Sequence, residues 1–199
     1  MTTPAEPALA KTVLRERLLA ARLARPPAER AAAADAVAAA LVGALRGRVS
    51  TLAAFVPDPE EPGSGRLPEA LTALGARLLL PVVPSTGRVL DWAEHTGELE
   101  VGRYGLSQPV GPRLGADALA AADAVVVPAL AVDRYGIRLG RGGGYYDRAL
   151  AYARPDAVLV TLVFDDERLE ELPREAHDRP VDAVVTPSGG WQDLAPTAG

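Results

Sequence analysis

Residues 138–148 gather side chains that could bind a phosphorylated ligand. They read Arg-Leu-Gly-Arg-Gly-Gly-Gly-Tyr-Tyr-Asp-Arg and lie between an apolar run and a predicted helix. The bare amides of Gly142–Gly144, at a helix N-terminus, can approach phosphate oxygens closely. The arginines can add charge-assisted hydrogen bonds, and Asp147 is a hard oxygen ligand suited to a phosphate-bound Mg²⁺. Tyr145 and Tyr146 offer flat surfaces and hydroxyls to an aromatic ligand.

The same segment departs from the common phosphate-binding motifs. No Gly-Lys-Ser/Thr occurs, so the loop is not a Walker A motif, and Tyr145 stands where Gly-x-Gly-x-x-Gly would need its third glycine. On spacing alone, a flexible surface loop whose two tyrosines pack into the core explains the residues equally well.

Lys11 is the only lysine in a chain that has 20 arginines and no asparagine. Such a composition indicates a drift that replaces Lys by Arg wherever either is tolerated. A surviving lysine can mark a place that needs a compact, flexible ammonium, although chance survival on a solvated helix face is an equal alternative.

Composition restricts the class of protein. The chain has 199 residues, 48% of them hydrophobic, which fits one globular α/β domain. The absence of cysteine excludes disulfides and thiolate chemistry. A net charge of -5 argues against nucleic-acid binding. With no signal-like N-terminus and no long apolar stretch, a cytoplasmic protein without membrane contact is expected.

The hydrophobic pattern alternates between helices and short apolar strands. Helices are predicted over 11–25, 28–46, 67–74, 116–122 and 145–153, with a helical turn over 166–172. Strands are predicted over 49–56, 77–83, 89–94, 124–130, 157–164 and 181–186, whereas 97–115 and 133–144 are predicted to be irregular.

This alternation predicts a single domain over 1–199, with a three-layer α/β/α fold, a mostly parallel sheet and a frayed tail at about 188–199. In such folds ligands bind beyond the carboxyl ends of the strands. The loops after residues 56, 83 and 130 should therefore share one rim.

Taken together, Arg138–Asp147 and the preceding Asp133-x-x-Gly136 resemble the signature of the 5-formyltetrahydrofolate cyclo-ligase family. The resemblance covers nearly the whole chain. Further matches are Lys11-x-x-x-Arg15, Glu61–Ser64, Leu80–Val83, the region of Trp92, and the stretch from His177-Asp178 through Asp182 to Thr186. Ser64 stands where threonine is common, and Gln108 stands where an acidic residue is frequent.

The resemblance implies a three-layer α/β fold and an ATP- and Mg²⁺-dependent reaction. In that reaction 5-formyltetrahydrofolate is cyclised to 5,10-methenyltetrahydrofolate, with release of ADP and phosphate. Because phosphoryl transfer depends mainly on positioning and charge, no nucleophilic triad is expected.

Residue types and the resemblance together assign candidate roles. The candidate catalytic residues are Arg138, Arg141 and Tyr146. ATP would be bound by Lys11 and Arg15 and by the loop residues Arg138, Leu139, Gly140, Arg141, Gly142, Gly143, Gly144, Tyr145 and Tyr146. Folate would be bound by Glu61, Trp92 and Tyr146, and Mg²⁺ by Asp147 and Asp178, with Asp182 as an alternative ligand. Glu61 could also be only an exposed loop acid, Trp92 and Tyr145 only core residues, and Asp178 and Asp182 only loop caps.

Two alternatives remain open. One is a non-catalytic relative that binds nucleotide or folate, although the basic pair and the glycine-rich signature are both intact. The other is a sugar-phosphate isomerase or acyl-CoA transferase on a similar scaffold, which would not need ATP. The expected partners are small molecules only, and the chain is expected to be a monomer.

Overall fold

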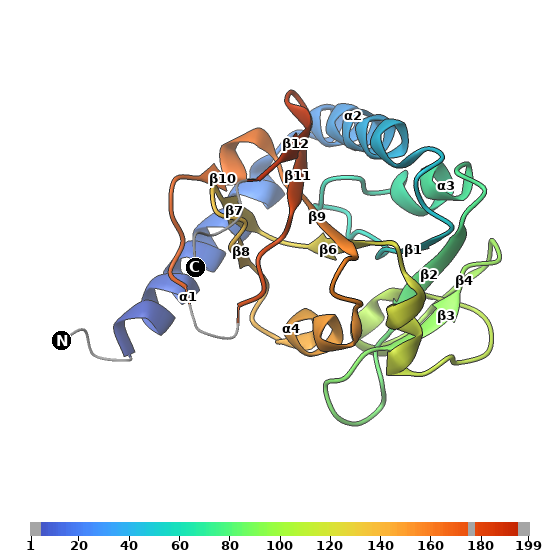
Figure 1. Cartoon of the computed structure of the whole chain (residues 1–199). Coiled ribbons are helices and arrows are strands. Elements are labelled where there is room, and N and C mark those ends of the chain that lie inside the picture. The colour runs from blue at the N-terminus through green and yellow to red at the C-terminus, as the bar shows by residue number, and fades with distance from the viewer. Residues whose placement is uncertain (1–4, 175–177, 195–199) are drawn as a thin grey trace.

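A seven-stranded sheet organises the molecule, which is described by a computed structural model over residues 5–174 and 178–194. Its strand order is β12-β11-β9-β6-β1-β2-β3 (Figure 1). The central pairings are parallel, and antiparallel strands close both edges. The strands are β1 Thr51–Ala53, β2 Arg77–Val82, β3 Asp91–Glu94, β6 Ala124–Pro128, β9 Val158–Leu162, β11 Ala183–Thr186 and β12 Gly190–Asp193.

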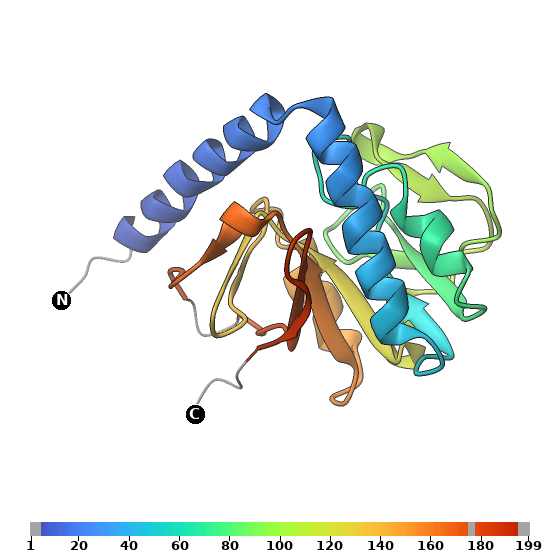
Figure 2. The same cartoon turned by 90° about the horizontal axis from the view of Figure 1, so that it is seen from above.

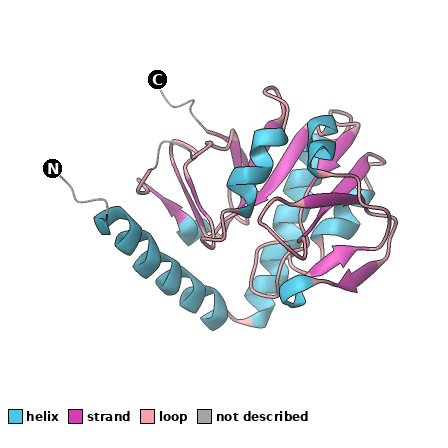
Figure 3. Ribbon diagram, turned by 90° about the horizontal axis from the view of Figure 1, so that it is seen from below, coloured by secondary structure: helices cyan, strands magenta, loops and turns pink. Residues whose placement is uncertain are grey.

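Both faces of this sheet are covered by helices. Successive side chains of a strand point to opposite faces, so one strand can contribute to two core clusters. In β6, Ala124 and Val126 pack in a core cluster with α2 and α3, whereas Val125 and Val127 pack with η2, α4 and η3. Figure 3 shows helices on both sides of the strands. The three-layer α/β/α prediction is therefore confirmed. The covering helices are α2 Pro27–Leu45, α3 Leu67–Thr72, η2 Ala116–Ala121, α4 Tyr145–Ala149 and η3 Leu150–Tyr152.

Helix α1 (Ala5–Ala24) lies outside these layers and extends from the body as a straight arm (Figure 2). Its Leu18 packs with Ile137 and Leu139 against a small second sheet, β10-β7-β8. That sheet is formed by β7 Ala131–Asp133, β8 Arg138–Leu139 and β10 Arg168–Leu169. The contact brings the N-terminal helix to the glycine-rich segment. Within the described ranges, no helix is long and apolar enough to cross a membrane.

Three segments contain short structure that the sequence pattern did not predict. The stretch 97–115 holds the hairpin β4 (Leu99–Val101) and β5 (Ser107–Pro109), with η1 (Arg103–Gly105) at its tip. The segment 133–144 includes β8, and the predicted turn at 166–172 is η4 (Asp165–Glu167) followed by β10. Strands of two or three residues are stabilised by their partners and carry too little pattern of their own to be recognised.

The prediction of a frayed tail from about residue 188 is wrong for residues 190–193. These residues form β12 and pair antiparallel with β11, and Trp191 packs against the cluster that contains α2. The turn before β12 is held by Asp165, whose Oδ1 accepts hydrogen bonds from the Ser188 hydroxyl at 2.6 Å and amide at 3.2 Å.

Candidate active site

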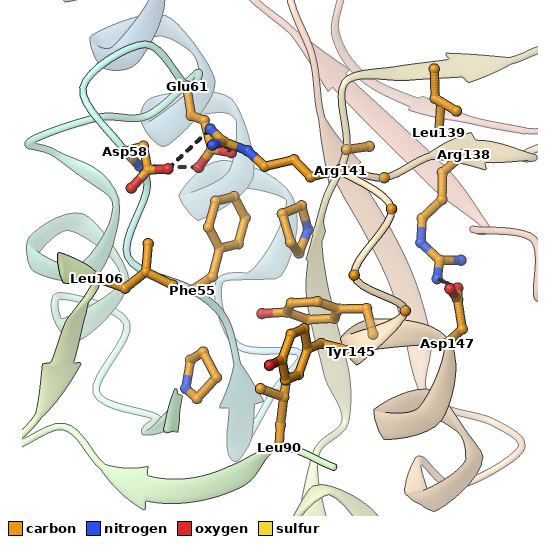
Figure 4. A pocket seen from close by; sticks show the side chains of 18 of the residues that line it. Phe55, Asp58, Glu61, Leu90, Leu106, Arg138, Leu139, Arg141, Tyr145 and Asp147 are labelled. Atoms are coloured by element: carbon orange, nitrogen blue, oxygen red, sulfur yellow. Dashed lines mark hydrogen bonds and ion pairs between the residues drawn. The ribbon is translucent and has the colours of Figure 1, made fainter. Parts of the chain in front are cut away.

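A cavity of about 560 Å³ opens at the carboxyl ends of β1, β2 and β6. Phe55 and Val56 line it after β1, Pro81 and Val83 from the end of β2, and Pro128 and Ala129 from the end of β6. The glycine-rich segment, the first helix and Asp178 also line it. Figure 4 shows Arg138, Arg141 and Tyr145 of the glycine-rich segment among the lining side chains. This is the rim predicted for the loops after residues 56, 83 and 130.

The glycine-rich segment follows β8 and runs along the cavity up to α4. Gly142 and Gly144 have φ values of +93° and +67°, which side chains with a Cβ rarely adopt. Leu139, Gly140 and Gly143 line the cavity with them. The backbone of this loop therefore faces the space where a ligand would bind.

Arg138 is the buried cation of the loop, with a side chain only 5% exposed. It forms an ion pair with Asp147, and its Nη1 donates to the carbonyl of Arg179 at 2.7 Å. Asp178, which also lines the cavity, interacts electrostatically with the same guanidinium. The two predicted metal ligands thus act on one arginine.

Arg141 projects across the cavity instead. Its Nη2 lies 3.0 Å from Asp58 Oδ2 and 3.1 Å from Glu61 Oε1 (Figure 4). The side chain is 47% exposed. Its ion pairs join the glycine-rich loop to the loop after β1, and a ligand in the cavity could replace them.

Glu61 is a buried cavity residue, and the alternative of an exposed loop acid is wrong. Its Oε2 accepts the Asp58 amide at 3.0 Å. Burial raises the pKa of Glu61, and the positive charges of Arg141 and Arg22 oppose that rise. A carboxylate in these surroundings can orient a polar group of a bound ligand.

Tyr146 presents a buried hydroxyl that has no hydrogen-bond partner among the described residues. Burial raises its pKa, and the negative charge of Glu61 adds to the rise, so the phenol stays neutral and can donate to a ligand. Tyr145, the preceding residue, also lines the cavity.

Lys11 and Arg15 lie one helical turn apart on α1 and both line the cavity. Lys11 is buried, with its Nζ 3.5 Å from Asp178 Oδ2. Arg15 Nε donates to the carbonyl of Gly140 at 2.9 Å. The reading of Lys11 as a solvated surface lysine is therefore wrong.

Trp92 does not reach this cavity, which contradicts its predicted place as a folate-stacking residue. It is fully buried in the core cluster behind β2, next to Leu79 and Leu119. In that cluster it packs with Leu119 of η2, and it is not among the residues that line the cavity.

The positions of two other residues do not support the roles predicted for them, phosphate binding by Arg148 and metal binding by Asp182. Arg148 donates to the carbonyl of Gly144 and is not among the lining residues. Asp182, the alternative metal ligand, accepts the amide of Leu159 at 2.7 Å, which is the loop-capping role. His177 lies outside the described residues.

Sequence reasoning missed Asp58 and Tyr104. Tyr104 stands at the tip of the β4–β5 hairpin with φ +60°, 67% exposed, and it lines the cavity. A hydrogen bond with Tyr104 raises the pKa of Tyr145. An aromatic residue between Gly102 and Gly105 was the available signal.

The mostly parallel sheet with helices on both faces defines an α/β protein, and its cavity is lined by arginines, glycines and tyrosines. The sequence profile of the 5-formyltetrahydrofolate cyclo-ligase family matches residues 8–187. The chain belongs to this family, a group of folate-metabolising ligases.

Relatives of known name agree with this assignment. The 5-formyltetrahydrofolate cyclo-ligase of Mycolicibacterium smegmatis is 43% identical over 90% of this chain and 95% of its own. The Escherichia coli K12 protein of the same name is 36% identical over 71% of this chain and 80% of its own. The solved Aquifex aeolicus 5,10-methenyltetrahydrofolate synthetase superimposes with a TM-score of 0.72 at 27% identity, covering 95% of both chains. The isomerase and transferase alternatives are thereby excluded.

Proposed function

We propose that this protein uses ATP and Mg²⁺ to cyclise 5-formyltetrahydrofolate to 5,10-methenyltetrahydrofolate, releasing ADP and phosphate. The observation that carries the proposal is a single cavity with two chemically different halves. One half has the loop amides with Lys11, Arg15 and Arg138, and the other has Glu61 and the tyrosines. ATP and a folate would meet at the boundary between them.

The phosphate half would bind the nucleotide. Because α4 has only five residues, the loop amides and the fixed cations, rather than a helix macrodipole, would hold the phosphates. Lys11 and Arg15 reach the cavity from α1, and Arg15 lies against the loop at Gly140, so both cations would join the loop amides around the triphosphate.

The carboxylates of Asp147 and Asp178 fit a Mg²⁺ ion that arrives with the nucleotide. In the described part of the chain, no three His, Cys, Asp or Glu side chains gather as a closed metal cage. Mg²⁺ that is shared with phosphates needs only one or two carboxylates from the protein. The bound ion would supply charge neutralisation at the phosphates, and Arg138 and Lys11 hold both carboxylates in place.

The other half would bind the folate. Phe55, Leu90 and Leu106 give it apolar surface, and Tyr104 and Tyr145 add aromatic rings. Glu61 would accept hydrogen bonds from the pterin, and the unpartnered hydroxyl of Tyr146 would donate to the formyl oxygen or a nearby acceptor.

The chemistry requires that a formamide oxygen become a leaving group. The formyl oxygen attacks the γ-phosphorus, the bond to ADP breaks, and an iminium-like phosphate ester forms. N10 then bonds to the formyl carbon, the carbon–oxygen bond to phosphate breaks, and the N10 proton is released. Arg138 and Arg141 would stabilise the charge on the transferring group, and the half-enclosed cavity would hold N10 near the carbon.

The test is to mix the purified protein with 5-formyltetrahydrofolate, Mg²⁺ and ATP and to follow the absorbance band of the methenyl product. We expect the band to appear only with ATP. Absence of the band with folded, ATP-binding protein would favour the non-catalytic relative. Absence of ATP binding would contradict the assignment of the phosphate half.

Replacing Lys11 with alanine is expected to raise the KM for ATP by about tenfold or more, because a phosphate loses a charged partner worth about 1.5–3 kcal/mol. The thermal unfolding midpoint should change little. Steady-state kinetics and thermal unfolding check this, with Arg17→Ala, on the exposed surface of the same helix, as the control. A normal KM in the Lys11 variant would remove this residue from the site.

Replacing Asp147 with asparagine is expected to lower kcat and to shift the Mg²⁺ titration to higher concentration, by about tenfold, because a charged oxygen ligand is lost. Asp182→Asn is the matched control and should keep the normal titration. An unchanged Mg²⁺ titration in the Asp147 variant would reject its metal role.

A further inference from the structure

Arg22 is a fully buried arginine on α1 that the reaction scheme above does not use. Its Nε and Nη2 donate to Glu167 at 2.6 and 2.8 Å, and Nη2 also donates to the carbonyl of Ala129 at 2.7 Å. The remaining nitrogen, Nη1, has no hydrogen-bond partner within the described residues and lies 3.9 Å from Glu61 Oε1. The Arg22 guanidinium therefore pairs with Glu167 and also lies next to Glu61, a carboxylate of the cavity.

The orientation of this guanidinium is more specific than anchoring of α1 requires. A buried charge is costly, and pairing with one carboxylate offsets much of that cost. Glu167 already provides that pairing from two atoms, and its Oε2 is further fixed by the Phe164 amide at 2.9 Å. The remaining nitrogen of the guanidinium, Nη1, faces Glu61 and places a buried positive charge next to this cavity residue.

Besides Arg22, three groups act on Glu61. Arg141 from the glycine-rich loop donates to Oε1, Asp58 lies beside it and donates its amide to Oε2, and the Tyr146 phenol interacts from α4. Of the two cations, Arg141 is exposed and is shared with Asp58, whereas Arg22 is enclosed and fixed. If the proposed nucleotide drew Arg141 away from Glu61, Arg22 would be the cation that stays there.

We propose that Arg22 is a positioning residue for Glu61: it keeps this carboxylate charged and oriented toward the folate half of the cavity while Arg141 is engaged by the nucleotide. The inference rests on the proposed function and deepens it. The nucleotide can then bind Arg141 while the folate binds Glu61. The charge of Glu61 would not depend on Arg141, because Arg22 remains beside it.

The first test needs no substrate. The carboxyl carbon of Glu61 is titrated by NMR in wild type, in Arg22→Gln/Glu167→Gln and in Glu167→Gln. The double variant replaces the buried ion pair with neutral amides, whereas the single variant weakens the same pair and keeps the cation beside Glu61. We expect the midpoint of Glu61 to rise by about one pH unit in the double variant only, and by more when Arg141→Ala is added. An unchanged midpoint would overturn the proposal.

The second test is the pH profile of the folate KM. In the double variant its acid limb should move upward with the NMR midpoint, giving about a tenfold higher KM below it, while kcat at saturating folate is retained. The shift should be absent in a Glu61→Gln background. A shifted NMR midpoint with an unshifted KM profile would show that the charge of Glu61 does not serve folate binding, and would also overturn the proposal.

Folding and function are controlled separately. If the amide pair does not fold, Arg22→Met/Glu167→Met replaces the ion pair with apolar side chains, a change that buried pairs often tolerate, and the same titration applies. If wild type makes no methenyl product, the proposed function fails, whereas the NMR titration still decides whether Arg22 controls Glu61.

Discussion

Arg138→Ala is expected to lower kcat for methenyl formation by about two to three orders of magnitude. The guanidinium is buried at the boundary of the cavity and interacts with both Asp147 and Asp178. Its loss would remove the charge that we propose faces the transferring phosphoryl group, and it would leave two carboxylates without their shared cation. Single-turnover kinetics at saturating ATP and folate measure the effect.

Arg134→Ala is the matched control for this prediction. Arg134 lies four residues earlier, is 56% exposed and pairs only loosely with Glu170, at 3.4 Å. It should retain kcat. A similar loss in both variants, or a normal kcat in the Arg138 variant with unchanged thermal unfolding, would contradict the role of Arg138 in phosphoryl transfer.

Glu61→Gln is expected to raise the folate KM by about 10- to 100-fold, because a charged hydrogen bond worth about 1.5–3 kcal/mol becomes a neutral one. The KM for ATP should change much less. Glu60→Gln, an adjacent acid that does not line the cavity, is the control. A folate KM that responds equally to both substitutions would assign the effect to the general charge of the loop.

The pH dependence gives the same residue a second signature. Burial holds the pKa of Glu61 above its ordinary value of 4.5. Folate binding that needs the carboxylate is therefore lost as pH falls through this raised pKa, and is retained above it. In Glu61→Gln that acid limb should be absent, which a KM profile over acidic pH would show.

The layers and the rim could be predicted from the sequence because their signals are local. Apolar runs such as 77–83 and 124–130 are typical of buried strands, and their alternation with helices predicts a mostly parallel sheet. The glycine-rich loop and the one-turn spacing of Lys11 and Arg15 are likewise contained in short segments. These residues do meet at one cavity.

The remaining parts depend on which distant segments meet. Trp92 and Tyr104 are both single aromatics near the middle of the chain, and only the placement of the β4–β5 hairpin decides that Tyr104 lines the cavity while Trp92 fills the core. Arg22 is one of 20 arginines, and its role follows from Glu167, which is 145 residues away. No sequence period marks such a pair.

The antiparallel strand β12 also covers a sheet edge that could otherwise pair with strands of other molecules. Without it, β11 would end the sheet as an apolar strand with every side chain buried and one row of backbone groups unpaired, a template for adding strands from other molecules. The strand that covers it ends in Asp193, and β3 on the opposite edge carries Asp91 and Glu94, so both outer edges are short and acidic. A shortened chain that ends near residue 188 would therefore lose solubility before it lost any residue of the cavity.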